Sequence, residues 1–420
     1  MPNTMSSRIC SAGAPGLALS VEAARLKALA VTAPIARTEV LALDDALGRV
    51  LAAPPLACSA VPPFSSAAMD GFAVQLADLD GEPPWTLPIT DRIAAGDTQL
   101  RSGLTGAARI FTGAPVPANA DYVIQRELVQ ETAGRIILQN WPAVGKNIRR
   151  AGEDCAAGSV MLQKGHQLSP ARLALLAATG CTDLEVFARL RVAILSTGDE
   201  LVEPGNELQY GQIYNSNRVL LRASLTKSWI KLTDLGIAPD DFATIRSILK
   251  STAIIHDVII TSGGMSAGCE DYILDALIAE KAELDVLKVA IRPGKPLTVG
   301  RLGSCMFFGL PGNPLAAAVT FSQIAMPSLR KAAGMTEVPD TWVPGVADFN
   351  YQRAPGRREF IPVRWSQRDQ VGRVVVEKLG NGSSAGLVPL GMAMGLAVIE
   401  PDQTVIRVGE ALRVEPLTDL

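Results

Sequence analysis

The order of apolar and polar positions predicts helices near the start of the chain, interrupted by a β-rich stretch. Apolar residues three and four apart predict a helix over 20–30, followed by a strand over 39–43 and a short helix capped by Asp44. A second long helical pattern covers 169–179, with a serine cap and a proline in its first turn. Between them, residues 64–150 contain short apolar stretches separated by Gly and Pro. We therefore expect a β-rich module inserted into a helical domain.

From residue 190 onward the pattern changes to short apolar strands that alternate with helices. The expected strands cover 190–195, 231–235, 257–260, 286–290 and 306–308, and the last helix covers 314–332. This alternation predicts a parallel sheet with helices on both faces. After Gly334 short strands with intervening Pro and Gly return, which predicts a small all-β module of the barrel type.

These changes predict a multidomain α/β protein with four domains. We expect an N-terminal helical domain formed by 18–60 and 157–189, with a β-rich domain over 61–156 inserted into it. An α/β domain over 190–335 and a small β-barrel over 336–420 follow.

Composition excludes several classes of protein. The chain has 420 residues, is 48% hydrophobic and 19% charged, and carries a formal net charge of −3. It therefore has material for real cores and lacks the basic character of a nucleic-acid binder. No apolar run approaches the roughly 20 residues of a membrane span. Six scattered cysteines without a C-x-x-C pair, and only two histidines, argue against zinc and suit a cytoplasmic protein.

The loops after three predicted strands have an unusual composition. Segments 196–200, 261–268 and 309–314 are rich in Gly, Ser, Thr and Pro, and in an open α/β sheet ligands bind beyond the carboxyl ends of the strands. Glycines let backbone N–H groups approach an anion, so these loops predict a site for a phosphate-bearing ligand; the alternative is turns that merely need positive φ. The candidate binding residues are Thr197, Gly198, Ser262, Gly263, Gly264, Ser266, Pro311, Gly312 and Asn313.

Carboxylates accompany the loops. Asp199 and Glu200 follow the first strand, and Glu270 and Asp271 begin the helix after the glycine loop. Adjacent carboxylates repel each other unless a cation such as Mg²⁺ or a basic side chain is near. Solvated helix starts are the alternative interpretation, since acids favour that position anyway.

Three cations lie around a Pro-Gly turn. Lys288, Arg292 and Lys295 fall within ten residues of one another, a pattern that suits a phosphate or an oxyanion. A surface strand with scattered basic residues is the alternative.

The β-rich stretch carries charged motifs of its own. Asp70 lies between apolar residues, where a carboxylate is costly unless it is hydrogen-bonded or functional. Segment 147–154 places Arg149 and a second guanidinium beside two acids, one of them Asp154. Two interpretations are open: a solvated salt-bridge cluster, or a clamp for an oxyanion with an acid alongside.

Together these segments resemble the molybdopterin molybdenumtransferase family, which includes MoeA and the C-terminal part of gephyrin. The similarity covers about residues 18–415. Its segments, in chain order, are 68–73, 112–117, 147–154, 196–201, 211–214, 262–266 and 310–314. The α/β part alone is shared with molybdopterin adenylyltransferases, so the combination is what identifies the family.

The resemblance implies an activity and an assembly. The enzyme would insert molybdate into adenylylated molybdopterin and release AMP, with Mg²⁺. The fold would combine a MoaB/MogA-like α/β domain with the other three domains in an elongated homodimer, with the site shared between the α/β domain of one chain and the β module of the other. Molybdopterin adenylyltransferase and molybdoenzyme chaperones would be candidate partners. The alternatives are an adenylyltransferase and a non-catalytic molybdopterin-binding scaffold.

The resemblance also assigns roles to residues. It implies catalytic acids at Asp70, Asp154, Glu200 and Asp271, of which all but Asp154 would bind metal. It places Thr112 and Arg149 at matching motif positions and Lys288 at a pocket cation. The chain departs from the usual family residues at Ser65, Asn215, Cys269 and Arg292.

Overall fold

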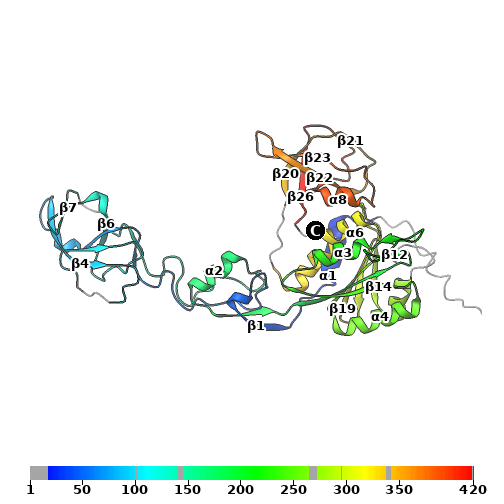
Figure 1. Cartoon of the computed structure of the whole chain (residues 1–420), viewed down its shortest axis with the longest axis horizontal. Helices are drawn as coiled ribbons and strands as arrows, with labels where there is room; N and C mark the ends of the chain where they lie inside the picture. The colour runs from blue at the N-terminus through cyan, green and yellow to red at the C-terminus, as the bar shows by residue number, and fades with distance from the viewer. Residues whose placement is uncertain are drawn as a thin grey trace, which may run out of the picture.

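The computed structural model describes residues 18–99, 103–140, 145–263, 272–294, 296–336, 342–418 and 420. The chain is elongated, with the β-rich module at one end and the α/β domain and the C-terminal β domain at the other (Figure 1). A narrow middle part joins the two ends. Among the described residues, no helix has the length and apolar character needed to cross a membrane.

The β-rich module is built on a six-stranded sheet in the order β6-β3-β5-β4-β8-β7. The strands are β3 (Gly71–Val74), β4 (Trp85–Ile93), β5 (Ala107–Ile110), β6 (Tyr122–Gln125), β7 (Gln130–Thr132) and β8 (Arg135–Leu138). Phe72, Trp85, Tyr122 and Ile136 form part of its core. A separate antiparallel pair, β2 (Ser66–Ala67) with β9 (Ile148–Arg149), joins the two ends of the module.

The middle part contains one helix and one strand pair. Helix α2 (Pro170–Ala178), capped by Ser169 as expected, packs with η1 (Leu43–Asp45) beside the antiparallel pair β1 (Thr38–Ala42) and β10 (Asp183–Phe187). The short helix that Asp44 was expected to cap is this single 3₁₀ turn. Asp44 lies within it, and the N-cap position is occupied by Ala42, which makes no side-chain cap hydrogen bond.

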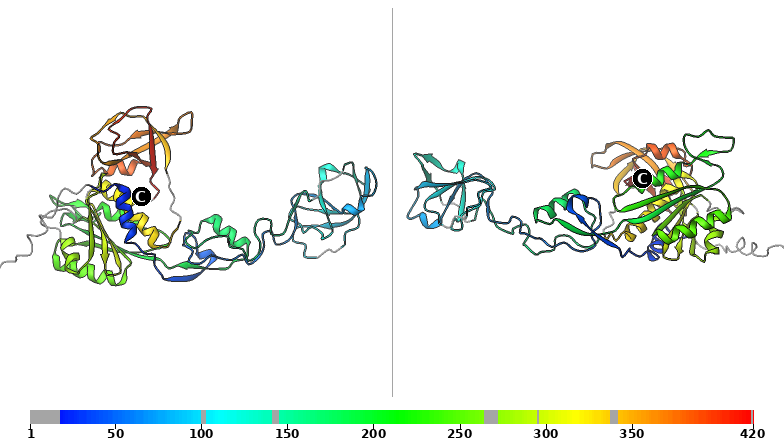
Figure 2. Two further views of the ribbon diagram at one scale, coloured as in Figure 1. Left: turned by 180° about the vertical axis from the view of Figure 1, so that it is seen from behind. Right: turned by 60° about the horizontal axis from the view of Figure 1, so that its bottom comes forward.

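The first helix does not belong to the core of the middle part. The buried face of α1 (Val21–Ala30) consists of Val21, Ala24 and Ala28, which pack against the last helices of the α/β domain. Figure 2 shows α1, in blue, beside those yellow helices. Small side chains permit this close approach, and Lys331 Nζ donates a hydrogen bond of 2.8 Å to the Leu29 carbonyl. The sequence assigned this helix to the same domain as α2, but the structure places its buried face in the core of the α/β domain.

The α/β domain has a six-stranded sheet in the order β14-β11-β15-β19-β18-β16. Its strands are β11 (Leu190–Thr197), β14 (Ile230–Ala238), β15 (Val258–Ser262), β16 (Glu283–Leu287), β18 (Leu297–Leu302) and β19 (Cys305–Leu310). Strands β14, β11, β15 and β19 run parallel to one another, whereas β18 runs antiparallel to both β19 and β16. Strand β18 was not among the expected strands, although Gly303-Ser304 between it and β19 is a two-residue hairpin signal; such a short connection joins antiparallel strands only.

Helices cover both faces of this sheet, as predicted. Helices α3 (Ser216–Ser224), α6 (Pro314–Thr320) and α7 (Met326–Ala332) pack on one face, and α4 (Phe242–Ile255) and α5 (Tyr272–Ala279) pack on the other. The single helix expected over 314–332 contains a π-helical turn, η4 (Phe321–Ala325), between α6 and α7. A small pair, β12 (Leu201–Val202) and β13 (Ile213–Tyr214), projects beside β11.

The C-terminal domain is a closed five-stranded β-barrel. Its strands are β20 (Val343–Ala347), β22 (Arg358–Arg368), β23 (Val374–Lys378), β24 (Gly395–Ile399) and β26 (Ala411–Pro416), and the β22–β24 pairing closes the ring. The pair β21 (Tyr351–Gln352) and β25 (Val405–Ile406) and the helix α8 (Leu387–Met392) complete the domain. A two-residue strand from the α/β region, β17 (Ile291–Arg292), adds to β22 in parallel.

Candidate functional site

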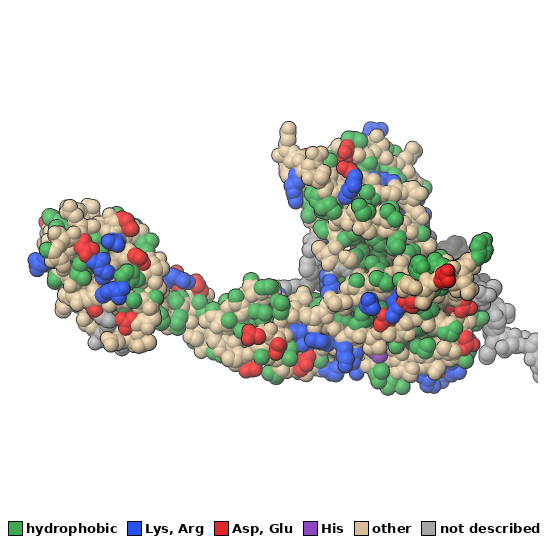
Figure 3. All heavy atoms as spheres, in the orientation of Figure 1, with side chains coloured by type: hydrophobic (Ala, Val, Ile, Leu, Met, Phe, Trp, Pro, Cys, Tyr) green, Lys and Arg blue, Asp and Glu red, His purple; other side chains and the backbone are tan. Residues whose placement is uncertain are grey.

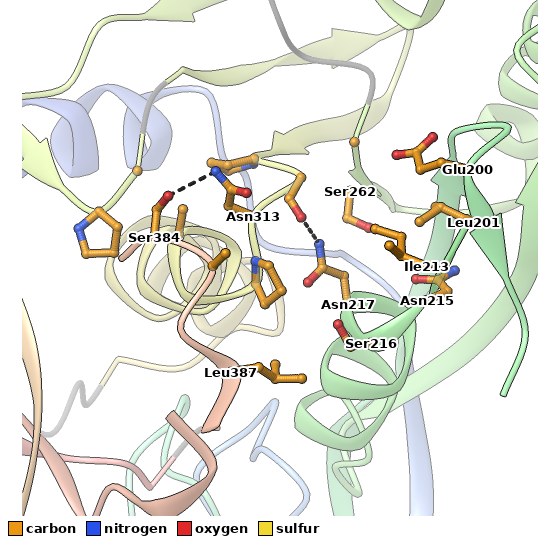
Figure 4. Close-up of a pocket in the computed structure, with 18 of the residues that line it drawn as sticks. Glu200, Leu201, Ile213, Asn215, Ser216, Asn217, Ser262, Asn313, Ser384 and Leu387 are labelled. Carbon is orange, nitrogen blue, oxygen red and sulfur yellow. Dashed lines mark hydrogen bonds between the residues drawn. The ribbon is translucent and has the colours of Figure 1, made fainter. Parts of the chain in front are cut away.

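A cavity of about 870 Å³ lies at the carboxyl ends of the parallel strands, between the α/β domain and the barrel domain (Figure 4). The strand-end loops supply one wall, β12 and β13 a second, and the segment before α8 a third. From the residues predicted by the sequence, the cavity lining includes Thr197, Glu200, Ser262, Gly263, Arg292, Pro311, Gly312 and Asn313.

The floor of the cavity is formed by the ends of β11 and β15, whose backbones lie in close contact. Gly263 follows β15 at φ +88°, and a Cβ atom there would lie 2.7 Å from the Thr197 carbonyl oxygen at the end of β11. Only glycine fits this position without a shift of the neighbouring strand. Thr197 is 3% exposed, and its hydroxyl has no hydrogen-bond partner among the described residues. The two strand ends thus bring backbone and an uncommitted hydroxyl to the cavity.

Two asparagines tie the loops together. Asn217 Nδ2 on α3 donates a 2.7 Å hydrogen bond to the Gly312 carbonyl, and Asn313 Nδ2 donates a 3.0 Å bond to Ser384 Oγ from the barrel domain (Figure 4). Asn215 caps α3 by accepting from the Arg218 backbone N–H at 3.1 Å. These bonds fix the loop after β19 between a helix and the barrel domain.

The cations of the cavity come from the seam between the two domains. Arg292 lines the cavity, and its Nε lies 3.2 Å from Glu359 Oε1 on β22. Arg357, which is exposed, also lines the cavity. Lys288, expected as a pocket cation, is exposed and is not among the lining residues. The backbone carbonyl of Lys288 instead accepts a 2.8 Å hydrogen bond from the Leu19 N–H, which holds this segment against the start of the described chain.

The two acids after β11 point in different directions. Glu200 lines the cavity, and its carboxylate lies against the buried Gly198, where a Cβ atom would collide with it. Asp199 instead exchanges hydrogen bonds with Asp240: its Oδ1 accepts from the Asp240 N–H at 3.1 Å. Of the pair, only Glu200 is therefore placed to meet a ligand.

The β module holds a second group of predicted residues. Asp70 Oδ1 accepts two 2.8 Å hydrogen bonds, from the backbone N–H and the hydroxyl of Thr112. These bonds, the backbone one first, lower the pKa of Asp70 below its usual value. Arg149 and Asp154 form an ion pair of 2.6 Å at the end of β9, which pairs with β2, the strand shortly before Asp70. All four side chains are exposed, so the module presents an ionised carboxylate to its surroundings.

A second cavity of about 910 Å³ lies in the β module and includes Ser65 and Arg150 in its lining. Ser65, one of the departures from the family pattern, accepts a 3.3 Å hydrogen bond from the Ala151 N–H through its hydroxyl. The serine thus has a structural partner in this chain. On the visible face of the β module, acidic and basic side chains are interspersed (Figure 3).

The cavity and the group of predicted residues in the β module lie at opposite ends of the elongated molecule (Figure 1). The expected metal ligands Asp70 and Glu200 are therefore separated, and no three His, Cys, Asp or Glu side chains in the described part of the chain are grouped to hold a metal ion. Gly264, Ser266, Asp271 and Lys295, and with them the departure at Cys269, lie outside the described residues.

Sequence reasoning missed several lining residues. Among them are Asn217, Arg357, Ser384 and Leu387. Leu201, Ile213 and Tyr214 also line the cavity; they lie in segments that carry the family resemblance, but no role was assigned to them. The polar segment that begins α3 was a usable signal for Asn217, because it follows the Ile213-Tyr214 motif directly. No local signal marks Arg357 or Ser384, since the barrel domain reaches the cavity only through tertiary packing.

Comparison with known proteins agrees with this architecture. Three family models match: the MoeA N-terminal region (domain I and II) over residues 19–180, a probable molybdopterin binding domain over 193–331, and the MoeA C-terminal region (domain IV) over 344–417. The molybdopterin molybdenumtransferase of Haemophilus influenzae is 35% identical over 405 residues, which cover 96% of this chain and 99% of the relative. Molybdopterin molybdenumtransferase 2 of Mycobacterium tuberculosis is 36% identical, covering 90% and 94%.

Solved structures show the same arrangement. Two crystal structures of the molybdopterin biosynthesis MoeA protein from Pyrococcus horikoshii superpose with TM-scores of 0.80 and 0.75, at 27% and 29% identity. Each covers 95% of this chain and 99% of its own. The chain therefore belongs to the MoeA family of molybdopterin molybdenumtransferases, which are transferases of molybdenum cofactor biosynthesis.

Proposed function

We propose that this protein inserts molybdate into adenylylated molybdopterin, releasing AMP, in a Mg²⁺-dependent reaction carried out by a cytoplasmic homodimer. In this reaction the two dithiolene sulfurs replace two oxygens of molybdate, which leave as water without a change in the oxidation state of molybdenum. One water is consumed as the phosphoanhydride bond is hydrolysed and AMP leaves. Free cysteines at positions 58, 155, 181 and 305 suit a reducing compartment. Molybdate and adenylylated molybdopterin are the substrates, and Glu200, Arg292 and the glycine loops would bind the latter.

The separation of the two half-sites carries this proposal. The cavity is lined by neutral hydrogen-bonding groups and also by the charged side chains of Arg292 and Glu200. The β module, which carries Asp70, Thr112, Arg149 and Asp154, lies at the other end of the molecule (Figure 1). One elongated chain does not bring these groups together, but two chains related by a twofold axis would each contribute a complementary half. We therefore propose that each active site combines the cavity of one protomer with the β module of its partner.

The exposed acids have the properties that the reaction requires. Neither the Asp70 nor the Glu200 carboxylate forms an ion pair with a described residue, and both Thr112 hydrogen bonds fall on the same oxygen of Asp70. Both carboxylates are thus available to hold Mg²⁺ in an assembled dimer. The ion would neutralise charge on the phosphates and on molybdate. Arg292 would orient the anhydride, and the Asp70 carboxylate, whose ionised form the Thr112 hydrogen bonds favour, would serve as a metal ligand.

The test uses two variants and their mixed dimer. Asp70→Asn and Glu200→Gln homodimers are each expected to lose at least about 100-fold in molybdate-dependent AMP release while remaining folded. A purified mixed dimer with one copy of each is expected to regain about half of the wild-type rate, because one of its two composite sites has both halves intact. Glu127→Gln, an exposed acid of the same β module, is the control and should keep the full rate.

Three results would contradict the proposal. An inactive mixed dimer would show that both acids act within one chain. Wild-type release by Asp70→Asn would remove the role given to that carboxylate. If the unmodified protein binds adenylylated molybdopterin but releases no AMP, a non-catalytic scaffold becomes the better description.

A further inference from the structure

A buried carboxylate stands behind the cavity at the seam between the α/β domain and the barrel. Glu359 on β22 is 2% exposed. Its Oε1 accepts a 2.9 Å hydrogen bond from the Tyr351 hydroxyl and lies 3.2 Å from Arg292 Nε. Its Oε2 accepts from Arg353, a guanidinium that is itself buried, at 3.4 Å. One acid is therefore held among two guanidiniums and a phenol.

The backbone fixes the same contact. In the parallel pairing of β17 with β22, Arg292 is the register partner of Glu359. The Arg358 N–H also donates a 2.8 Å bond to the Ala290 carbonyl. The segment that carries Arg292 is thus an added strand of the barrel, although it belongs to the α/β region in sequence. Its side chain reaches the cavity from this seam.

The geometry leaves part of the guanidinium uncommitted. An arginine has five N–H donors in a planar fork, and a contact at Nε leaves its two terminal NH₂ groups for other partners. The Arg292 side chain is 37% exposed. Gly382 lies beside its Nη2 atom, at a distance where a Cβ atom would be 3.8 Å away, so no side chain fills the space there. Two cations around one carboxylate also leave a net positive charge at the seam. These features suit an anionic group of the ligand.

We propose that Glu359 is a positioning residue that holds the Arg292 guanidinium toward the cavity, so that its free N–H groups bind the phosphate part of the substrate. The inference deepens the proposed function and rests on it for the identity of the substrate. It gives the barrel domain a role in the reaction: the barrel supplies the carboxylate that orients an α/β-domain cation.

Removing the Glu359 charge should change anion binding in opposite directions, depending on whether this carboxylate neutralises Arg292 or positions it. If Glu359 only neutralised Arg292, replacing it with Gln would strengthen the binding of an anion, because one negative charge near the cavity would be lost. If it positions Arg292, the same change weakens binding, because the guanidinium loses its fixed orientation and pays the entropy of being ordered by the ligand. A purely structural role would leave the wild-type affinity unchanged in folded protein.

The experiment measures pyrophosphate binding to the full-length protein by calorimetry. Glu359→Gln and Arg292→Ala are each expected to raise the dissociation constant about tenfold, as for the loss of a charge-assisted contact. The double variant is expected to bind no more weakly than Arg292→Ala alone, since Glu359 acts through that side chain. Glu377→Gln, which breaks an exposed Arg–Glu pair of the same barrel, is the matched control and should bind as the wild type does.

Two further measurements complete the test. If Glu359→Gln does not fold, Tyr351→Phe removes one bond to the same carboxylate oxygen and is expected to weaken binding by about two- to threefold. In the AMP-release assay, Glu359→Gln should raise KM about tenfold and change kcat by less than about twofold. Stronger or unchanged pyrophosphate binding by Glu359→Gln, or additive losses in the double variant, would overturn the inference. Absence of AMP release from the wild type would instead contradict the proposed function and leave the pyrophosphate result valid.

Discussion

The cavity of the α/β domain and the acid cluster of the β module differ in how their side chains are held. Thr197 and Ser262 in the cavity are 3% and 2% exposed and sit at the ends of strands within a sheet. Asp70 and Asp154 are exposed and are held by hydrogen bonds or an ion pair to residues of the same module. The cavity is therefore shaped by packing across two domains, whereas the acid cluster is shaped locally.

This difference agrees with two halves that have different tasks. A site that binds a large substrate benefits from fixed walls, because ordering is then completed before binding. A group that completes the site of another chain must instead stay on the surface until the chains meet. Substitutions at the buried strand ends of the cavity should accordingly change stability, whereas substitutions in the exposed acid cluster should change activity and leave stability largely unaltered.

The largest expected contrast in stability is between two glycines with positive φ. Gly263→Ala meets both the left-handed backbone cost and a 2.7 Å approach to the Thr197 carbonyl, so it should destabilise the α/β domain by about 3 kcal/mol. Gly152→Ala in the β module has φ +73° but ordinary contacts of 3.8 Å, so it should cost about 1 kcal/mol. Hydrogen exchange, resolved by peptide, measures the two domains separately. Equal losses would show that close packing does not distinguish the regions.

A smaller contrast concerns the dependence of stability on pH. Burial on its own would raise the pKa of Asp257, but hydrogen bonds from Arg37 and Arg191 outweigh it and lower the pKa to about 2. A lowered folded-state pKa stabilises the protein above the unfolded value, near pH 4, and this stabilisation disappears as the pH falls toward 2. Asp257→Asn should therefore cost about 2 kcal/mol at neutral pH and flatten the loss of stability between pH 4 and 2.

The comparison variant for this prediction is Asp70→Asn. Its carboxylate is fully exposed, so its thermal midpoint at neutral pH should stay close to that of the wild type. Acid titration of the unfolding midpoint checks both variants. A large shift for Asp70→Asn, or none for Asp257→Asn, would reverse the assignment of stability to one region and activity to the other.

The smallest effect is expected from hydroxyls without partners. Thr197→Val and Thr261→Val each remove a buried hydroxyl that has no hydrogen-bond partner among the described residues, so each should stabilise the α/β domain by about 1 kcal/mol. Thr197 lines the cavity and Thr261 does not. Binding of the substrate should therefore weaken in Thr197→Val alone. If both variants bind equally well, the Thr197 hydroxyl has no part in recognition.

Local pattern was sufficient for most elements and for one side of the site. Ser169 and Pro170 marked the start of α2, and the Gly-rich segments after β11, β15 and β19 marked the loops that meet at the cavity. These signals are local, because capping, turn chemistry and strand alternation act over a few residues. The placement of α1 could not be obtained in this way: its face of Val21, Ala24 and Ala28 fits several surfaces, and only the assembled domain selects one.

The sequence by itself determined the family, the alternation of strands and helices, and the presence of two sets of charged motifs. Only the tertiary structure decided that Asp70 and Glu200 lie at opposite ends of the chain, and that Arg292 pairs with Glu359 across 67 positions of sequence. The reason is physical. Propensity and periodicity depend on neighbours along the chain, whereas the environment of a charge depends on whichever distant segments pack around it.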